Sequence, residues 1–276
     1  MKRAFILIWI LALLQGCSVT RTAYNNADVF LSWQANHYFD LEGEQVEELD
    51  RRLDIYHAWH RKQALPQYAR IGQEAAARIQ RGLKREDLEW GYDAVQAQIR
   101  EALGQAAGEA TGLLDRLSAA QISRLEQRLA EDNRKFAKER MQGTMEQRHQ
   151  RRVKRNTERL EEWYGPLTEA QTERVRRYSE RAPYSAELQD RDRKRRQAEF
   201  VAMLRARETG TRLKPWVQNW DTGRAPEYAA AVQATRAEYT ELLLDLDRTL
   251  SADQREHAAS RLKRFSALFD SLARQP

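Results

Sequence analysis

The only thiol of the 276-residue chain, Cys17, stands where a lipid-attachment site is expected. The chain opens with Met1-Lys2-Arg3, continues with an apolar run over residues 4–14, and then reads Leu14-Gln15-Gly16-Cys17. A basic start, a short apolar segment and a small residue before the cleavage point are what a secretory signal requires. Such a short apolar helix spans about 16 Å of the roughly 30 Å hydrocarbon core, which favours a cleaved signal over a permanent transmembrane helix. We therefore predict a signal peptide over residues 1–16 and lipidation of Cys17 by acyl chains such as palmitate.

The predicted lipid implies a location. Two or three acyl chains hold a protein stably on a membrane, whereas a single chain is marginal. Ser18, rather than Asp, follows Cys17, and this resembles the pattern that Gram-negative bacteria send to the outer membrane. We expect a protein anchored on the periplasmic face of the outer membrane, with a lipidated tether over residues 17–28 and one helical domain over residues 29–276.

Metal and cofactor chemistry finds little support in the sequence. A single Cys excludes an internal disulfide framework and any Cys-based zinc or iron–sulfur cage. Asp54, His57 and His60 share one helix face and could form a metal trio, but the neighbouring Tyr56 and Trp59 favour an aromatic packing region. We predict no metal site and no cofactor.

The acidic residues allow an alternative function, that of an enzyme acting on peptidoglycan. Glu161 and Glu162 precede Trp163 and Tyr164, which could place a carboxylate beside an aromatic wall. The Glu-Ser pair of lytic peptidoglycan enzymes is missing, and paired glutamates on a helix surface are common. We therefore predict a protein without enzymatic activity, with a peptidoglycan-active helical enzyme as the alternative.

Positive charge is concentrated in the middle of the chain. The formal net charge is +6, and residues 134–200 hold 19 Lys and Arg against 12 Asp and Glu, a net +7. In the periplasm the reachable anions are lipid headgroups, lipopolysaccharide and acidic or unfolded protein, with no nucleic acid. The alternative is a solvated helix face on which glutamates alternate with arginines. The predicted anion-binding residues are Arg148, Arg151, Arg152, Lys154, Arg155, Arg191, Arg193, Lys194, Arg195 and Arg196.

The elements that must position these residues are helices. The chain is rich in Ala, Leu, Glu, Gln and Arg, and its apolar residues recur with a period of 3.6. We predict an all-α fold, an elongated bundle of long helical hairpins. A continuous helix over 118–164 would be about 70 Å long, more than a compact globule of this size allows, unless Gly143 breaks it. Pro66 is expected to end or kink the first helix. The predicted helices cover residues 44–63, 67–81, 85–115, 118–164, 168–181, 185–208, 226–248 and 251–273.

One spacing recurs at three helix starts. Residues 117–121, 167–171 and 250–254 each read Leu, a hydroxyl residue, two others, and Gln. The hydroxyl can accept a hydrogen bond from a free backbone N–H, while the Gln side chain reaches back to the backbone N–H of the hydroxyl residue. We predict capping boxes at Ser118, Thr168 and Ser251. A looser copy over residues 41–45 has Glu42 in place of the hydroxyl residue.

Two resemblances follow from these motifs. The Leu-Thr-x-x-Gln spacing resembles that of the Spy-type periplasmic chaperones, small helical cradles that bind unfolded clients. The stretch over residues 24–69, with Trp33-Gln34, Tyr38-Phe39-Asp40-Leu41 and Trp59-His60-Arg61, together with residues 163–171, is similar to an uncharacterised family of Gram-negative lipoproteins. That resemblance implies a helical lipoprotein and supplies no catalytic residue. We expect a binding, scaffold or chaperone-like envelope protein.

Overall fold

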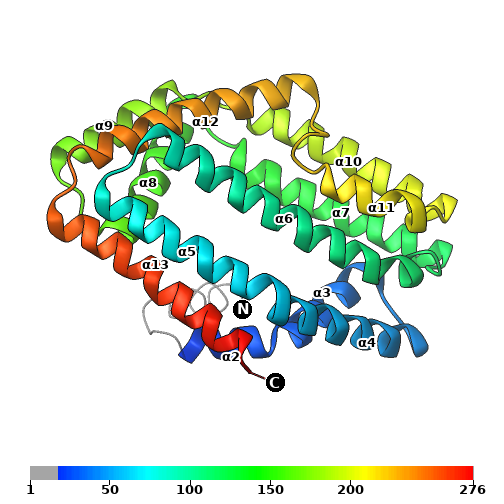
Figure 1. Ribbon diagram of the computed structural model, residues 1–276. Helices are drawn as coiled ribbons and strands as arrows, with labels where there is room; N and C mark the ends of the chain where they lie inside the picture. The colour runs from blue at the N-terminus through cyan, green and yellow to red at the C-terminus, as the bar shows by residue number, and fades with distance from the viewer. Residues whose placement is uncertain (1–17, 276) are drawn as a thin grey trace.

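The computed structural model describes residues 18–275, and within this range every element is a helix (Figure 1). The all-α prediction is confirmed, and the helices form an elongated bundle. The elements are α2 (Ser18–Asn25), α3 (Ala27–Phe39), α4 (Glu44–Trp59), the π-helical turn η1 (His60–Ala64), α5 (Leu65–Arg81), α6 (Arg85–Leu114), α7 (Ala119–Arg140), α8 (Met145–Tyr164), α9 (Glu169–Arg181), α10 (Ala186–Ala206), α11 (Thr209–Gln218), α12 (Pro226–Asp247) and α13 (Ala252–Ala273).

The longest continuous helical path among the described residues contains a proline, and we call this path the rod. The helical path from Glu44 to Arg81 is continuous, because η1 joins α4 to α5. In this turn the N–H of Leu65 donates to the carbonyl of His60, five residues back, and Pro66, which has no N–H, follows in the first turn of α5. Of the two outcomes expected at Pro66, an end of the helix is wrong, because the helical path continues through the wider turn. The α-helical hydrogen bonding is interrupted just before the proline, over residues 60–64. At about 1.5 Å per residue the rod is about 57 Å long.

The predicted helix over 118–164 is two helices, and this prediction is wrong. Gly143 adopts a φ of 91°, which other residues avoid, and Thr144 caps a new helix by accepting the N–H of Gln147. The break separates the partners of the two halves: α7 packs against α10 and α3, whereas α8 packs against α9 and α13. The rod over 44–81, and not the segment 118–164, accounts for the elongation.

The last helix lies antiparallel along the rod. Arg255, near the start of α13, donates to the carbonyl of Ile79 over 2.7 Å, and Arg61 donates to the carbonyl of Leu272 over 3.4 Å. Midway, a Cβ placed on Gly72 would collide with Ser266 Oγ, so glycine is what lets α5 and α13 approach. Figure 1 shows the two helices side by side.

Two main hydrophobic cores lie at different ends of the bundle, and a smaller cluster joins α5 to α13. The first core is built mainly by α6, α7, α10 and α11, and the second by α8, α9, α12 and α13. The first contains Leu41, Ala107, Leu113, Leu114, Leu117, Ile122, Leu125, Val201, Met203, Leu204 and Leu213. The second contains Leu160, Tyr164, Val175, Tyr178, Ala182, Leu242, Leu246 and Ala258.

The predicted capping boxes at Ser118, Thr168 and Ser251 are confirmed, and their glutamines do more than cap. Gln171 and Gln254 exchange two amide hydrogen bonds of 3.0 Å each, beside the second core. Gln121 makes the same reciprocal contact with Gln45, of the looser copy, over 2.7 and 3.3 Å. We call these the first (Gln45–Gln121) and second (Gln171–Gln254) glutamine pairs, and each joins helix starts that are distant in sequence.

Three helices lie outside the predicted set. α2 falls within the predicted tether, where Arg21 donates to Ser271 of α13 over 2.9 Å. α3 packs on α4 and α7, where its Tyr38 hydroxyl donates to Asp132. α11 forms despite Gly210 and Pro215, because it packs along α6 and its Thr209 hydroxyl and N–H both donate to Asp115 Oδ1. Tertiary contacts therefore outweigh the local helix-breaking residues.

Candidate anion-binding surface

One face of α8 carries a row of arginines. Arg148, Arg152, Arg155 and Arg159 follow one another at intervals of four, three and four residues, which places them on a single helix face. We call these four residues the arginine stripe. The capping box at Thr144 fixes where α8 begins, and so fixes the position of the stripe relative to α9 and the turn that follows it.

The first arginine of the stripe is committed to internal contacts. Arg148 Nη1 lies 2.7 Å from Glu187 Oε1, and its guanidinium also donates to the carbonyls of Met141 and Gly143. The neighbouring Arg151 donates to the carbonyl of Gln142. These two residues therefore hold the turn between α7 and α8.

The second arginine is half-buried and incompletely bonded. Arg152 Nη1 donates to the carbonyl of Pro183 over 3.1 Å, and its guanidinium lies 5.5 Å from the centre of the Tyr184 ring. Its Nε and Nη2 atoms are buried without a hydrogen-bond partner within the described residues. Burial lowers the pKa of Arg152, which means that the protein destabilises this cation and that an anion would relieve the penalty.

The remaining arginines face one another. Burial lowers the pKa of Arg155, and the positive charges of Arg140, Arg151 and Arg159 lower it further. Within residues 18–275, Arg140, Arg155 and Arg159 have no carboxylate within salt-bridge distance. The exposed Lys154 lies 3.8 Å from Glu158. We call Arg152, Arg155 and Arg159 the upper part of the stripe. Together with the neighbouring Arg140 they carry positive charge that no carboxylate of the described residues balances.

The second predicted cluster, on α10, is used within the fold. Arg193 donates to Asn133 of α7 over 3.1 Å, and Arg196 donates to the carbonyl of Trp216 of α11 over 3.1 Å. Lys194 pairs with Asp190, and Arg195 pairs with Asp192, at 2.6 and 2.7 Å. Arg191 is exposed. Four of these five cations therefore stabilise α10 and its neighbours, and the structure does not bring them to the stripe.

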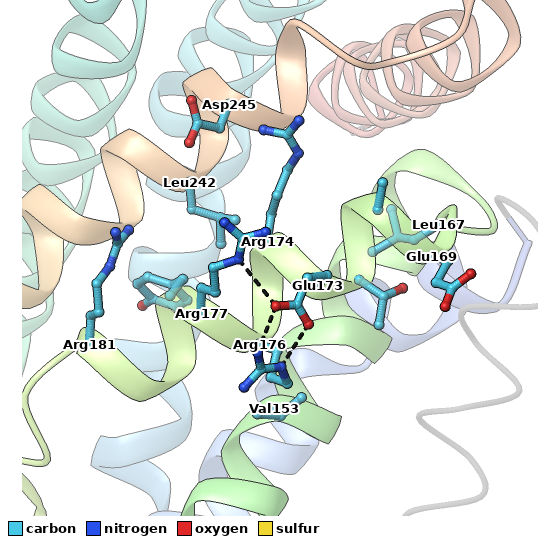
Figure 2. A pocket seen from close by; sticks show the side chains of 13 residues that line it. Val153, Leu167, Glu169, Glu173, Arg174, Arg176, Arg177, Arg181, Leu242 and Asp245 are labelled. Atoms are coloured by element: carbon cyan, nitrogen blue, oxygen red, sulfur yellow. Dashed lines mark hydrogen bonds and ion pairs between the residues drawn. The ribbon is translucent and has the colours of Figure 1, made fainter.

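A large open groove near the stripe is electrostatically balanced. It encloses about 1050 Å³ between α8, α9 and α12, and Figure 2 shows Arg176 and Arg177 converging on Glu173. The distances from Glu173 Oε1 are 2.6 Å to Arg176 Nη2 and 3.2 Å to Arg177 Nε, and these arginines lower the pKa of Glu173 to about 2. Arg181 pairs with Glu238 at 3.1 Å. Because three of its four arginines, Arg176, Arg177 and Arg181, have carboxylate partners, this groove attracts anions less than the stripe does.

Comparison with known proteins places the chain in a family. Residues 37–229 match the model described as "Family of unknown function (DUF6279)". The chain belongs to this family. No curated protein and no solved structure matches the chain. The match spans the stripe and the first glutamine pair, so the family assignment covers the candidate surface without assigning an activity to it.

The other sequence-predicted residues occupy different surroundings in this DUF6279 protein. Glu161 and Glu162 are exposed, whereas Tyr164 behind them is buried in the second core. His60 Nδ1 lies 3.0 Å from Tyr24 Oη, and the His57 ring centre lies 4.8 Å from that of Tyr24. The predicted aromatic packing region is therefore confirmed, and within residues 18–275 no three metal-ligating side chains form a group.

Cys17 lies outside the described residues, so its lipidation stays a prediction. In the described part of the chain, no helix has both the length and the apolar character needed to cross a bilayer. Sequence reasoning missed Arg140 and Arg159 as members of the charged surface. The spacing of four from Arg155 to Arg159 was a readable signal for the second of these, whereas Arg140 approaches only because the chain turns at Gly143.

Proposed function

We propose that this protein is a lipid-anchored envelope protein that binds phosphate-bearing anionic lipids through the upper arginine stripe, Arg152, Arg155 and Arg159, with Arg140. The observation that carries the proposal is the set of guanidinium groups without carboxylate partners. Other basic side chains on α8 and α10, such as Arg148, Lys194 and Arg195, pair with nearby carboxylates.

Phosphate suits this arrangement because of guanidinium geometry. A guanidinium presents a planar fork of N–H donors that matches two phosphate oxygens, and it remains charged at every physiological pH. The exposed Arg155 and Arg159 present such groups at the surface. Each basic residue near an anionic membrane surface contributes about 1 kcal/mol, so a cluster of four gives useful affinity without a deep pocket.

The proposed location is the periplasmic face of the outer membrane, through acyl chains on Cys17. Its support is the sequence of the first 18 residues. Replacing Cys17 with Ala should release the protein from the membrane fraction and leave its amino terminus uncut. Unchanged fractionation with the same uncut terminus in both proteins would contradict the anchor.

We propose binding without catalysis. A carboxylic acid that protonates a glycosidic oxygen needs a raised pKa, which burial in an apolar site provides. Among the described residues, each carboxyl group with a resolved shift has a lowered pKa, as Asp87, Asp192 and Glu173 illustrate. Glu161 and Glu162 are exposed, which is the environment of an ordinary surface carboxylate.

Sedimentation with vesicles tests the stripe. The mature chain carrying Cys17→Ser is mixed at low salt with vesicles that contain or lack phosphatidylglycerol. A triple variant, Arg140→Gln, Arg155→Gln and Arg159→Gln, should lose at least tenfold in affinity for the anionic vesicles, because about 1 kcal/mol is removed with each charge.

The matched control removes the same charge elsewhere. Arg51, Arg124 and Arg248 are exposed to 62%, 62% and 73%, and each pairs with a carboxylate. Changing these three to Gln should alter the affinity less than threefold. Equal losses in the two triple variants would show that net charge alone drives binding, and would refute the stripe as a site. Protection of a denatured client against aggregation, retained by the stripe variant, would instead support the chaperone-like alternative.

A further inference from the structure

Exposed apolar side chains are concentrated on one short helix. Val29, Phe30, Leu31 and Trp33 of α3 are exposed to 64%, 46%, 39% and 57%. Among the described residues, the other large hydrophobic side chains that are exposed are Ile55, Val95 and Met145. A protein surface rarely gathers such groups in one place unless something covers them.

The exposed face of α3 is an ordered surface. Its opposite side is fixed to the molecule, since Ser32 Oγ donates to Asp50 of α4 over 2.9 Å and Tyr38 donates to Asp132 of α7. Along the outer side, the ring centres of Phe30 and Trp33 lie 6.1 Å apart, and the Trp33 ring stacks on His37 at 5.9 Å. The aromatic rings at positions 30, 33 and 37 therefore form a continuous row on a helix whose other face is held in place.

The position of this face in the chain identifies what covers it. α2 begins at Ser18, the residue after Cys17, and Val29 is 12 residues beyond Cys17, at most about 18 Å along a helical path. The intervening segment is docked onto the body of the protein: Arg21 donates to Ser271 over 2.9 Å, and Tyr24 Oη lies 3.0 Å from His60 Nδ1. Acyl chains on Cys17 would thus hold the bilayer close to α3.

We propose that the exposed face of α3, formed by Val29, Phe30 and Trp33, rests in the interfacial layer of the leaflet that holds the lipid anchor. The proposal rests on the proposed lipidation for the position of the membrane. Trp and Phe are side chains that helices lying in a membrane interface use. The exposed acidic residues Asp50 and Asp54 on neighbouring α4 mean that this contact depends on apolar insertion and not on anionic lipid.

Vesicles of zwitterionic phospholipid test this contact separately from the stripe. The probe is phosphatidylcholine, and the protein is the mature chain with Cys17→Ser, so that no acyl anchor contributes. The wild-type surface should bind at high lipid concentration with little dependence on salt. Val29→Asp should weaken binding at least fivefold, and Phe30→Asp combined with Trp33→Asp should abolish it.

Val95 provides the matched control, because it is a valine exposed to 50% on α6, away from α3. Val95→Asp should leave vesicle binding unchanged, and circular dichroism should show the same helix content in every variant. Phosphatidylcholine with brominated acyl chains should quench part of the tryptophan emission, and Trp33→Phe should remove that quenching while keeping most of the binding.

Three results would overturn the proposal. One is equal binding by the Val29→Asp and Val95→Asp variants, and another is quenching that persists in Trp33→Phe. The third is a concentration-dependent dimer in sedimentation velocity that Trp33→Asp breaks, since a second copy of the chain would then cover α3. Failure of the anchor itself is read from the fractionation of Cys17→Ala, which is independent of these vesicle measurements.

Discussion

Replacing Gln171 with Leu removes one half of the second glutamine pair. The Gln171 side chain is 1% exposed and makes four hydrogen bonds. Its Oε1 accepts the backbone N–H of Thr168 and an amide N–H of Gln254, and its Nε2 donates to the carbonyl of Thr249 and to Gln254 Oε1. Leu fills a similar volume but offers neither a donor nor an acceptor.

The cost follows from the groups that lose their partners. The backbone N–H of Thr168 and the carbonyl of Thr249 are left without Gln171, whereas Gln254 keeps its bonds to Pro166 and Ser251. An unsatisfied buried polar group costs about 1 to 3 kcal/mol, or about 2 to 6 kcal/mol for two. Because these two groups are only partly buried, Gln171→Leu should lower the free energy of unfolding by an amount in the lower part of that range, about 2 to 4 kcal/mol. Gln147 holds the same position in the capping box of α8 but is exposed. Water replaces its bonds, so Gln147→Leu should cost no more than about 1 kcal/mol.

Urea unfolding followed by circular dichroism measures both variants, with the midpoint compared at equal slope. The double variant Gln171→Leu with Gln254→Leu should cost less than the sum of the two single changes, because the two residues share bonds. Equal costs for Gln171→Leu and Gln147→Leu would refute the reasoning, since they would show that the pairing across helices contributes nothing beyond local capping.

Two further changes test the rod and its aromatic end. Gly72→Ala should lower the melting temperature, because the new Cβ collides with Ser266 Oγ. Adding Ser266→Ala should restore the melting temperature, and no recovery in the double variant would contradict the close approach of α5 and α13. Burial, reinforced by His57, lowers the pKa of His60 to about 4. In the unfolded chain His60 has a pKa of about 6.5, so as the pH falls it binds a proton there before it does in the folded protein. The free energy of unfolding should therefore decline between pH 6.5 and 4, by no more than about 2 kcal/mol after allowance for partial exposure. His60→Gln should flatten this part of the pH dependence of the urea midpoint, and an unchanged curve would show that His60 is not responsible.

Local chemistry explains which features the sequence could predict. A capping box needs only a hydroxyl and a glutamine three residues apart, so Ser118, Thr168 and Ser251 were readable as helix starts. The pairing of Gln121 with Gln45 could not be predicted from the sequence, because two segments 76 residues apart have to meet at one core. The same holds for α11, whose helix forms through contacts with α6.

The arginine clusters show the same difference between local features, which the sequence predicts, and tertiary contacts, which it does not. The two arginine-rich runs look alike in sequence, yet the structure commits Arg193 and Arg196 to contacts with α7 and α11 and leaves Arg155 and Arg159 among like charges. Sequence spacing gives the helix face on which a cation lies. Whether an acidic group or a carbonyl meets it there is decided by tertiary packing, so the number of free cations could not be counted beforehand.

Residue-resolved modification of the arginines by phenylglyoxal, read by mass spectrometry, tests the central claim on the unmutated stripe. The mature chain with Cys17→Ser is treated alone, with phosphatidylcholine vesicles and with vesicles that also contain phosphatidylglycerol. We predict that phosphatidylglycerol slows modification of Arg140, Arg155 and Arg159 severalfold at low salt, that high salt restores it, and that Arg248, exposed and paired with Asp245, reacts equally throughout. Equal protection of Arg248 and the stripe, or no protection of Arg155 and Arg159, would contradict the proposed anion-binding surface.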